Sequence, residues 1–200
     1  MLASIPSPSF NVFHIGPLAI HIYGIIMGIA VATAFVVLTY RYEKLGGDRK
    51  VAESAGFWCI VIGFIGARAA FVLPRLTEPH EHWWWVFQIW NGGIALFGGL
   101  TFGLLTAIFV VRRRGGDFWK FADAAAVALP AAQAIGRWGN YFNQELFGPP
   151  TSLPWGLQID PDNRPAAYLD AETFHPTFLY EMLWNIGIIV LLLWLERHRK

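Results

Sequence analysis

Charged residues and cysteine are scarce in this sequence. Asp, Glu, Lys and Arg make up 14% of its 200 residues, and hydrophobic residues make up 55%. A soluble domain has roughly a quarter of its residues charged, so the scarcity excludes an ordinary water-soluble domain and indicates a protein surrounded mainly by lipid. The single cysteine, Cys59, excludes an internal disulfide and offers no metal-binding motif. Because Cys59 lies within a hydrophobic run, we expect an unreactive buried thiol.

Long hydrophobic runs are abundant instead. Spanning a membrane takes about 20 apolar residues in a helix. Five segments qualify, and we predict an all-α integral membrane protein that forms one polytopic membrane domain over residues 1–200. The predicted spans are 17–40, 52–73, 92–111, 118–142 and 176–195. Residues 143–175 are acidic and rich in proline, so we expect an extramembrane arm there. The N-terminal stretch has no basic region and no small-residue cleavage site, so we expect no removable signal peptide.

Lysine and arginine are distributed unevenly among the connecting segments. The N-terminal tail has none, and later segments alternate between several and one: four in 41–50, one in 74–91, three in 112–119, one in 143–175 and three in 196–200. Cytoplasmic loops carry the excess of basic residues. We therefore predict an outer N-terminus and a cytoplasmic C-terminus. The tryptophan run at residues 83–85 then lies at the outer interface, where tryptophan is enriched.

Polar side chains are concentrated near the outer ends of the predicted spans. Ionisable residues inside a membrane are costly and usually functional. Four different spans bring such residues to the outer half: Tyr23 from the first, Arg68 from the second, Arg137 and Asn140 from the fourth, and His175 and Glu181 from the fifth. The sequence therefore predicts a polar cavity that opens outward.

Arg137 lies on a polar face of the fourth span. Gln133, Arg137, Asn140 and Gln144 follow spacings of 4, 3 and 4 residues, which places them on one side of a helix. An arginine at this depth needs an anion, and two interpretations remain open. Glu181 or Glu145 could form a purely structural ion pair with it. Alternatively, the guanidinium could bind a phospholipid phosphate bidentately, an interpretation favoured by the similar depth of Arg68.

The segment GRWGNYFNQELFG, residues 136–148, resembles the signature of the prolipoprotein diacylglyceryl transferases, G-R-x-G-N-F-x-N-x-E-x-x-G. Tyr141 is the one mismatch, for a usual Phe. Four other segments resemble this family in order and spacing, so that the resemblance covers nearly the whole chain: AIHIYG (19–24), GARAAFVL (66–73), IWNGGIALFGGL (89–100) and HPTFLYE (175–181). The tryptophan-rich sequence of these segments is similar to that of actinobacterial members.

This resemblance implies a transferase that moves the diacylglyceryl group of phosphatidylglycerol onto the lipobox cysteine thiol of a prolipoprotein signal peptide. The reaction is the first step of bacterial lipoprotein maturation and releases glycerol 1-phosphate. The implied location is the plasma membrane, with a multi-pass chain whose active site faces the outer leaflet. The implied partners are phosphatidylglycerol, the prolipoprotein and membrane lipids. No metal, other cofactor or nucleic acid is expected.

The resemblance also implies roles for individual residues. Arg137 matches the signature arginine and is expected to bind the lipid phosphate and stabilise the charge on the leaving group. Asn140, Asn143 and Glu145 are expected to orient the glycerol moiety or hold Arg137. A thiol with a pKa of about 8.5 needs a base or a positive field. The candidate bases are Glu181 and Tyr23, and Tyr23 is also expected to contact the head group. Further substrate-binding candidates are Arg68, Gly98, Gly99, Gly148 and His175, with the two adjacent glycines allowing close approach of lipid.

Two features depart from the family pattern. Phe97 stands where many members have a histidine that has been proposed as a base, and a phenylalanine cannot accept a proton. Family members also usually continue through two further helices, with another functional arginine, after the fifth span. An alternative hypothesis is therefore a shortened, catalytically impaired homologue that only binds lipid or lipopeptide. A transporter is a weaker hypothesis, because the sequence has no paired half-helix pattern or inverted repeat.

Overall fold

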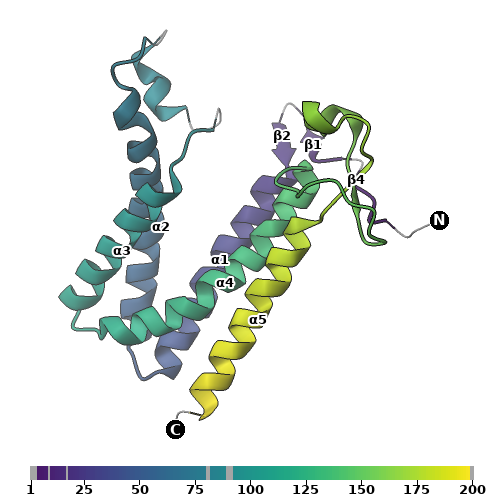
Figure 1. Cartoon of the computed structure of the whole chain (residues 1–200). Coiled ribbons are helices and arrows are strands. Elements are labelled where there is room, and N and C mark those ends of the chain that lie inside the picture. The colour runs from purple at the N-terminus through teal and green to yellow at the C-terminus, as the bar shows by residue number, and fades with distance from the viewer. Residues whose placement is uncertain (1–3, 9, 17, 80–81, 89–91, 199–200) are drawn as a thin grey trace. The chain divides into compact units, whose positions relative to one another are not determined.

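The computed structural model describes residues 4–8, 10–16, 18–79, 82–88 and 92–198 (Figure 1). These residues are mainly helical, as the sequence predicts. The helices are α1 (Ile22–Lys44), α2 (Arg49–Val72), α3 (Leu96–Arg113), α4 (Phe118–Asn143) and α5 (Thr177–His198). Four short strands were not predicted. They form two two-stranded antiparallel sheets, β1 (Val12–Ile15) with β2 (Leu18–His21) and β3 (Leu157–Gln158) with β4 (Thr173–Phe174).

Each predicted span corresponds to one of these helices, with shifted ends. The first was predicted from residue 17, but residues 18–21 form β2 and α1 begins only at Ile22. Within the described residues, four helical segments are long and apolar enough to cross a membrane: α1, α2 extended to Arg75, α3 and α5. The more polar α4, which contains Lys120, Asp123 and Arg137, is not among them. The protein is thus a helical membrane protein, and a total of five spans remains a prediction.

The chain divides into two compact units. Unit 1 comprises Met1–Ala34 and Ala126–Lys200, and unit 2 comprises Phe35–Ala125. Unit 2 is built on the antiparallel packing of α2 and α3. A Cβ atom added to Gly98 would lie 2.6 Å from the carbonyl oxygen of Gly66, and the Ala95 amide donates to the Ala67 carbonyl at 2.9 Å. Small residues permit such close backbone approach between helices in lipid. The partly buried Cys59 thiol donates to the Gly103 carbonyl at 3.3 Å.

In unit 1, the first turns of α1, the second half of α4 and α5 lie side by side (Figure 1). The rings of Trp138 and Tyr141 on α4 lie 5.6 and 4.9 Å from the ring of Phe178 on α5. The predicted arm contains β3 and β4 and packs on the start of α5 through a core of Leu157, Ile159, Phe174 and Phe178. The N-terminal segment joins this core, because the Ile5 amide donates to the Gly156 carbonyl at 2.8 Å.

Candidate functional site

An ion pair between α4 and α5 lies at the centre of the candidate site. Arg137 is on the second-last turn of α4, and Glu181 is on the second turn of α5. Nη2 of Arg137 contacts Oε2 of Glu181, and the two side chains are 30% and 46% exposed. The structure therefore contains one of the two ion pairs that the sequence left open for Arg137. Of the two possible carboxylate partners, it pairs Arg137 with Glu181.

The other polar residues of the signature segment extend this pair into a chain of hydrogen bonds. Nη1 of Arg137 donates to Oδ1 of Asn140 at 3.2 Å, and Nδ2 of Asn140 donates to Oε1 of Glu145 at 2.9 Å. Nδ2 of Asn143 donates to the same Glu145 oxygen at 3.3 Å. Because the amide nitrogen of the buried Asn140 is held by Glu145, its carbonyl oxygen faces Arg137. Glu145 thus orients Asn140, and Asn140 orients the guanidinium.

The helix face predicted from residue spacing ends before Gln144. Gln144 and Leu146 have φ angles of +50° and +53°, a left-handed conformation that is unfavourable for residues with a Cβ atom. The buried Gln144 side chain therefore turns toward the arm. Its Nε2 donates to Oδ2 of Asp160 at 2.6 Å, and its Oε1 accepts from the Asp160 amide at 2.8 Å. Gln144 ties the arm to the end of α4 and does not share the face of Arg137.

Gly148 and His175 connect the arm to the start of α5. The Gly148 amide donates to the His175 carbonyl at 2.9 Å, and a Cβ atom on Gly148 would lie 2.8 Å from the Cβ of His175. Nδ1 of His175 lies 3.1 Å from the Tyr180 hydroxyl oxygen, which accepts from the Trp155 indole N–H at 3.0 Å. These contacts hold the arm against the first turn of α5, the turn that precedes Glu181.

Tyr23 lies against the turn of α4 that carries the site. A Cβ atom added to Gly139 would lie 2.7 Å from Cδ2 of Tyr23. Gly139 therefore leaves room for the aromatic ring between α1 and α4. Its neighbour in sequence, Asn140, belongs to the hydrogen-bonded chain described above. Within the described part of the chain, the Tyr23 hydroxyl has no recorded hydrogen bond.

Three predicted residues, Arg68, Gly98 and Gly99, lie in unit 2 and contact other parts of that unit. The Arg68 guanidinium donates to four backbone carbonyls in the segment before α3, those of Trp85, Val86, Gly92 and Gly93, at 2.7–2.8 Å. Residues 89–91 of the quoted motif lie outside the described residues. Gly98 and Gly99 both face the backbone of α2. Their observed contacts hold a loop and pack two helices, and substrate binding by these three residues remains a prediction.

Asn185 was not selected from the sequence, although it lies next to the site residues. It is 6% exposed, and its Nδ2 donates to the backbone carbonyl of Glu181, one turn earlier on α5, at 2.8 Å. The sequence did contain a signal for Asn185, because it is a polar residue inside an apolar span and lies four positions after Glu181. The described residues contain no group of three His, Cys, Asp or Glu side chains that could hold a metal ion.

Comparison with known proteins identifies relatives over almost the entire sequence. The family described as prolipoprotein diacylglyceryl transferase matches residues 11–200. Three similar curated proteins are each named phosphatidylglycerol–prolipoprotein diacylglyceryl transferase. They come from Cutibacterium acnes, 45% identical over 197 residues, Frankia alni, 42% over 203, and Streptomyces coelicolor (its second such protein), 41% over 199.

These alignments differ in how much of each protein they cover. They include 97%, 100% and 96% of this chain, but only 67%, 53% and 62% of the three relatives. The chain therefore spans about half to two thirds of the length of these relatives. The family match nevertheless includes every residue of the Arg137 network. On this basis, the chain belongs to the prolipoprotein diacylglyceryl transferase family.

Proposed function

We propose that this protein transfers the diacylglyceryl group of phosphatidylglycerol to the cysteine thiol of a prolipoprotein lipobox. The observation that carries the proposal is the partly exposed Arg137, held between Glu181 and Asn140 in the segment that resembles the family signature. The names of the relatives supply the lipid and the protein substrate. The arginine supplies the chemistry that recognises the phosphate of that lipid.

Arg137 binds the lipid phosphate in this proposal. A guanidinium has five N–H donors. Among the described contacts, Arg137 uses one for Glu181 and one for Asn140, so further donors are available. Two phosphate oxygens can accept two parallel N–H···O hydrogen bonds from one guanidinium. The phosphate therefore competes with the Glu181 carboxylate for Arg137. Asn140, held by Glu145, keeps the guanidinium oriented when Glu181 is displaced.

The reaction forms a carbon–sulfur bond and breaks a carbon–oxygen bond. The cysteine sulfur attacks the carbon of the diacylglyceryl group that is bonded to the phosphate ester oxygen. The bond between this carbon and that oxygen breaks, and the oxygen leaves as part of glycerol 1-phosphate. Arg137 stabilises the negative charge that develops on the leaving group. Glu181, released from Arg137 by the phosphate, accepts the thiol proton. Tyr23, beside Gly139, is the second candidate for this acceptor and for contact with the head group.

The proposed location is the bacterial plasma membrane, with the Arg137 site toward the outer leaflet. Basic residues support this orientation, because they lie at the ends of α1, α3 and α5 that would face the cytoplasm: Arg41 and Lys44, Arg112 and Arg113, and Arg197. With α4 as a fifth span, the end of α4 and the start of α5 lie on the opposite side. Glu181 and the arm are then accessible to an exported prolipoprotein.

A transfer assay with the purified chain tests the proposal. The protein is mixed with phosphatidylglycerol and a lipobox peptide, and both glycerol 1-phosphate and diacylglyceryl-modified peptide are measured. The matched controls are a peptide with serine in place of the cysteine and the Arg137→Ala variant. Product formation that requires both the thiol and Arg137 supports the transferase. If the protein retains phosphatidylglycerol but forms neither product, the transferase proposal is wrong and the alternative, a protein that only binds lipid, is favoured.

A further inference from the structure

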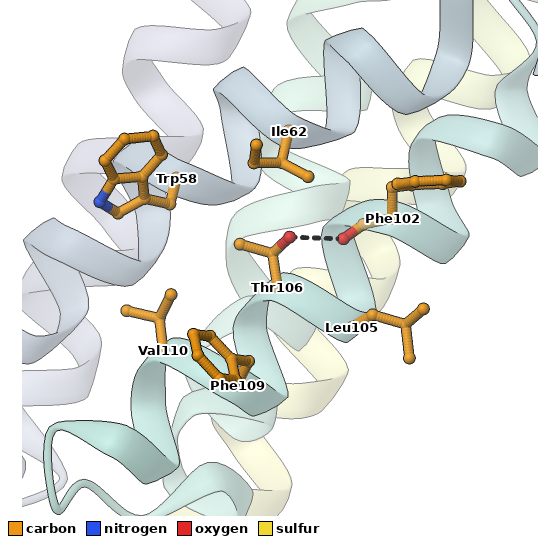
Figure 2. A pocket seen from close by; sticks show the side chains of 7 residues that line it. All are labelled: Trp58, Ile62, Phe102, Leu105, Thr106, Phe109 and Val110. Carbon is orange, nitrogen blue, oxygen red and sulfur yellow. Dashed lines mark hydrogen bonds between the residues drawn. The ribbon is translucent and has the colours of Figure 1, made fainter. Parts of the chain in front are cut away.

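An apolar groove lies between α2 and α3, on helices that do not contribute to the Arg137 network. Its volume is about 410 Å³. Trp58 and Ile62 line it from α2, and five side chains line it from α3: Phe102, Leu105, Thr106, Phe109 and Val110 (Figure 2). Both helices are apolar and long enough to cross a membrane. The groove is therefore a candidate binding site within the hydrocarbon region.

The lining of the groove suits a hydrocarbon chain. The polar side-chain groups among the seven lining residues are the Thr106 hydroxyl and the Trp58 indole N–H, and the hydroxyl donates to the Phe102 carbonyl of its own helix at 2.7 Å (Figure 2). The other five lining side chains are pure hydrocarbon, so most of the groove offers an occupant apolar contact only. Phe102 and Val110 are eight residues apart, which corresponds to about 12 Å along a helix. The site is thus elongated, as an acyl chain is.

Exposed cations lie at one end of the groove. Phe109 and Val110 precede the run Arg112, Arg113 and Arg114 at the end of α3, and these three arginines are exposed. None of the three has a recorded acidic partner among the described residues. The nearby Asp117 carboxylate accepts from the Trp119 and Lys120 amides. At the facing end of α2, Arg49 is already paired with Glu43 and Glu53.

We propose that this groove binds one anionic phospholipid, with an acyl chain between α2 and α3 and its phosphate against Arg112–114. One such molecule supplies both the hydrocarbon and the negative charge that the two parts of the site require. A second copy of this chain is a poorer occupant. Two copies packed in a parallel manner through this face would bring their arginine runs to the same depth, where like charges repel.

Photolabelling of the 200-residue protein tests the site. The protein is placed in phosphatidylcholine nanodiscs that contain a small fraction of probe lipid with a diazirine on one acyl chain. Phosphatidylglycerol and phosphatidic acid probes represent two sources of the anionic phosphate, and a phosphatidylcholine probe with the same acyl chain is the neutral comparison. Labelled peptides are then mapped by mass spectrometry. We expect both anionic probes to label residues 58–62 and 102–110 more strongly than the neutral probe does.

Two variants separate the groove from its basic end. Leu105→Trp narrows the groove and should reduce labelling there, whereas Leu104→Trp, on an exposed neighbour that does not line the groove, should not. Changing one of the three arginines to glutamine should weaken retention of an anionic probe about fivefold and leave the neutral probe unaffected. Equal labelling by neutral and anionic probes would overturn the proposal. So would labelling that Leu105→Trp does not change.

Discussion

Arg137 and Glu181 join α4 to α5 through an ion pair that is only partly buried. Both side chains remain accessible, at 30% and 46% exposure, so an incoming phosphate can reach the guanidinium and offer it the oxyanion contacts that the carboxylate now provides. The hydrogen bond from Arg137 to the buried Asn140 does not depend on Glu181. The arrangement therefore holds the guanidinium in place while leaving its counterion exchangeable. The two interpretations open at the sequence level, a structural pair and a phosphate site, are compatible in this geometry.

Replacing Arg137 by lysine should be nearly as damaging as replacing it by alanine. Lysine keeps the charge but cannot present a planar pair of donors to phosphate, nor reach both Glu181 and Asn140 in the same way. We expect kcat to fall on the order of a hundredfold or more in both variants. The transfer assay with a lipobox peptide measures this. An Arg137→Lys enzyme with nearly full activity would show that charge alone suffices.

Glu181→Gln should separate lipid binding from turnover. Glutamine removes the charge that competes with phosphate and also the proton acceptor. We expect retained or tighter phosphatidylglycerol binding, together with a loss of at least a hundredfold in kcat, the low end for general-base catalysis. Lipid retention and product formation are measured on the same preparation. If kcat is unchanged, Glu181 is not the acceptor, and Tyr23→Phe becomes the deciding variant.

Glu145→Gln should disturb the orientation of the Arg137 guanidinium through Asn140, which lies between them in the chain of hydrogen bonds. Oε1 of Glu145 accepts from both Asn140 and Asn143, and hydrogen bonds to a charged group contribute about 1.5–3 kcal/mol. If the lower value is lost from the transition state, kcat/KM falls about tenfold. Glu172→Gln, at an exposed position of the same arm, is the matched control and should remain active. Equal activity of both variants would contradict an orienting role for Glu145.

The region around Arg137 was predictable because its residues are close in sequence and follow the period of a helix. The 3.6-residue repeat correctly places Arg137 and Asn140 together, as their hydrogen bond confirms. The same rule fails at Gln144, because α4 ends at Asn143 and the next residue adopts a left-handed conformation. That turn is made without glycine, so the sequence carries no ordinary signal for it.

Other differences arise from backbone contacts between distant segments. Arg68 was selected as a substrate-binding residue because it lies inside a span, which remains a prediction, and the structure adds four hydrogen bonds from its guanidinium to carbonyls of a loop 17–25 residues later. Carbonyl acceptors exist at every residue, so sequence cannot show which ones a guanidinium will meet. The first predicted span likewise included β2 together with α1. A short apolar strand cannot be distinguished from the start of an apolar helix by its hydropathy.

The hydrogen bonds of Gln144 should protect the arm from local opening. Gln144→Ala removes the bond to the Asp160 amide, and one such bond is worth about 1 kcal/mol, so amide exchange at Asp160 should accelerate roughly fivefold. Gln144→Gly loses the same bonds but relieves the left-handed strain. It should therefore be more stable than the alanine variant by about 1 kcal/mol. Unchanged exchange in both variants would contradict this tether.

Gly98→Ala distinguishes a packing role from lipid approach. The new methyl group would lie 2.6 Å from the Gly66 carbonyl oxygen and even closer to the Ala70 side chain, and overpacking of this kind costs about 1–3 kcal/mol. Each kcal/mol lowers the melting temperature of a protein this size by roughly 2–4 °C. The control is Gly103→Ala, whose methyl group would lie 3.9 Å from the Cys59 carbonyl oxygen. If Gly98 instead serves only to admit lipid, the alanine variant melts like the wild type and loses transfer activity. Melting in detergent and the transfer assay, measured on both variants, therefore decide between α2–α3 packing and substrate contact.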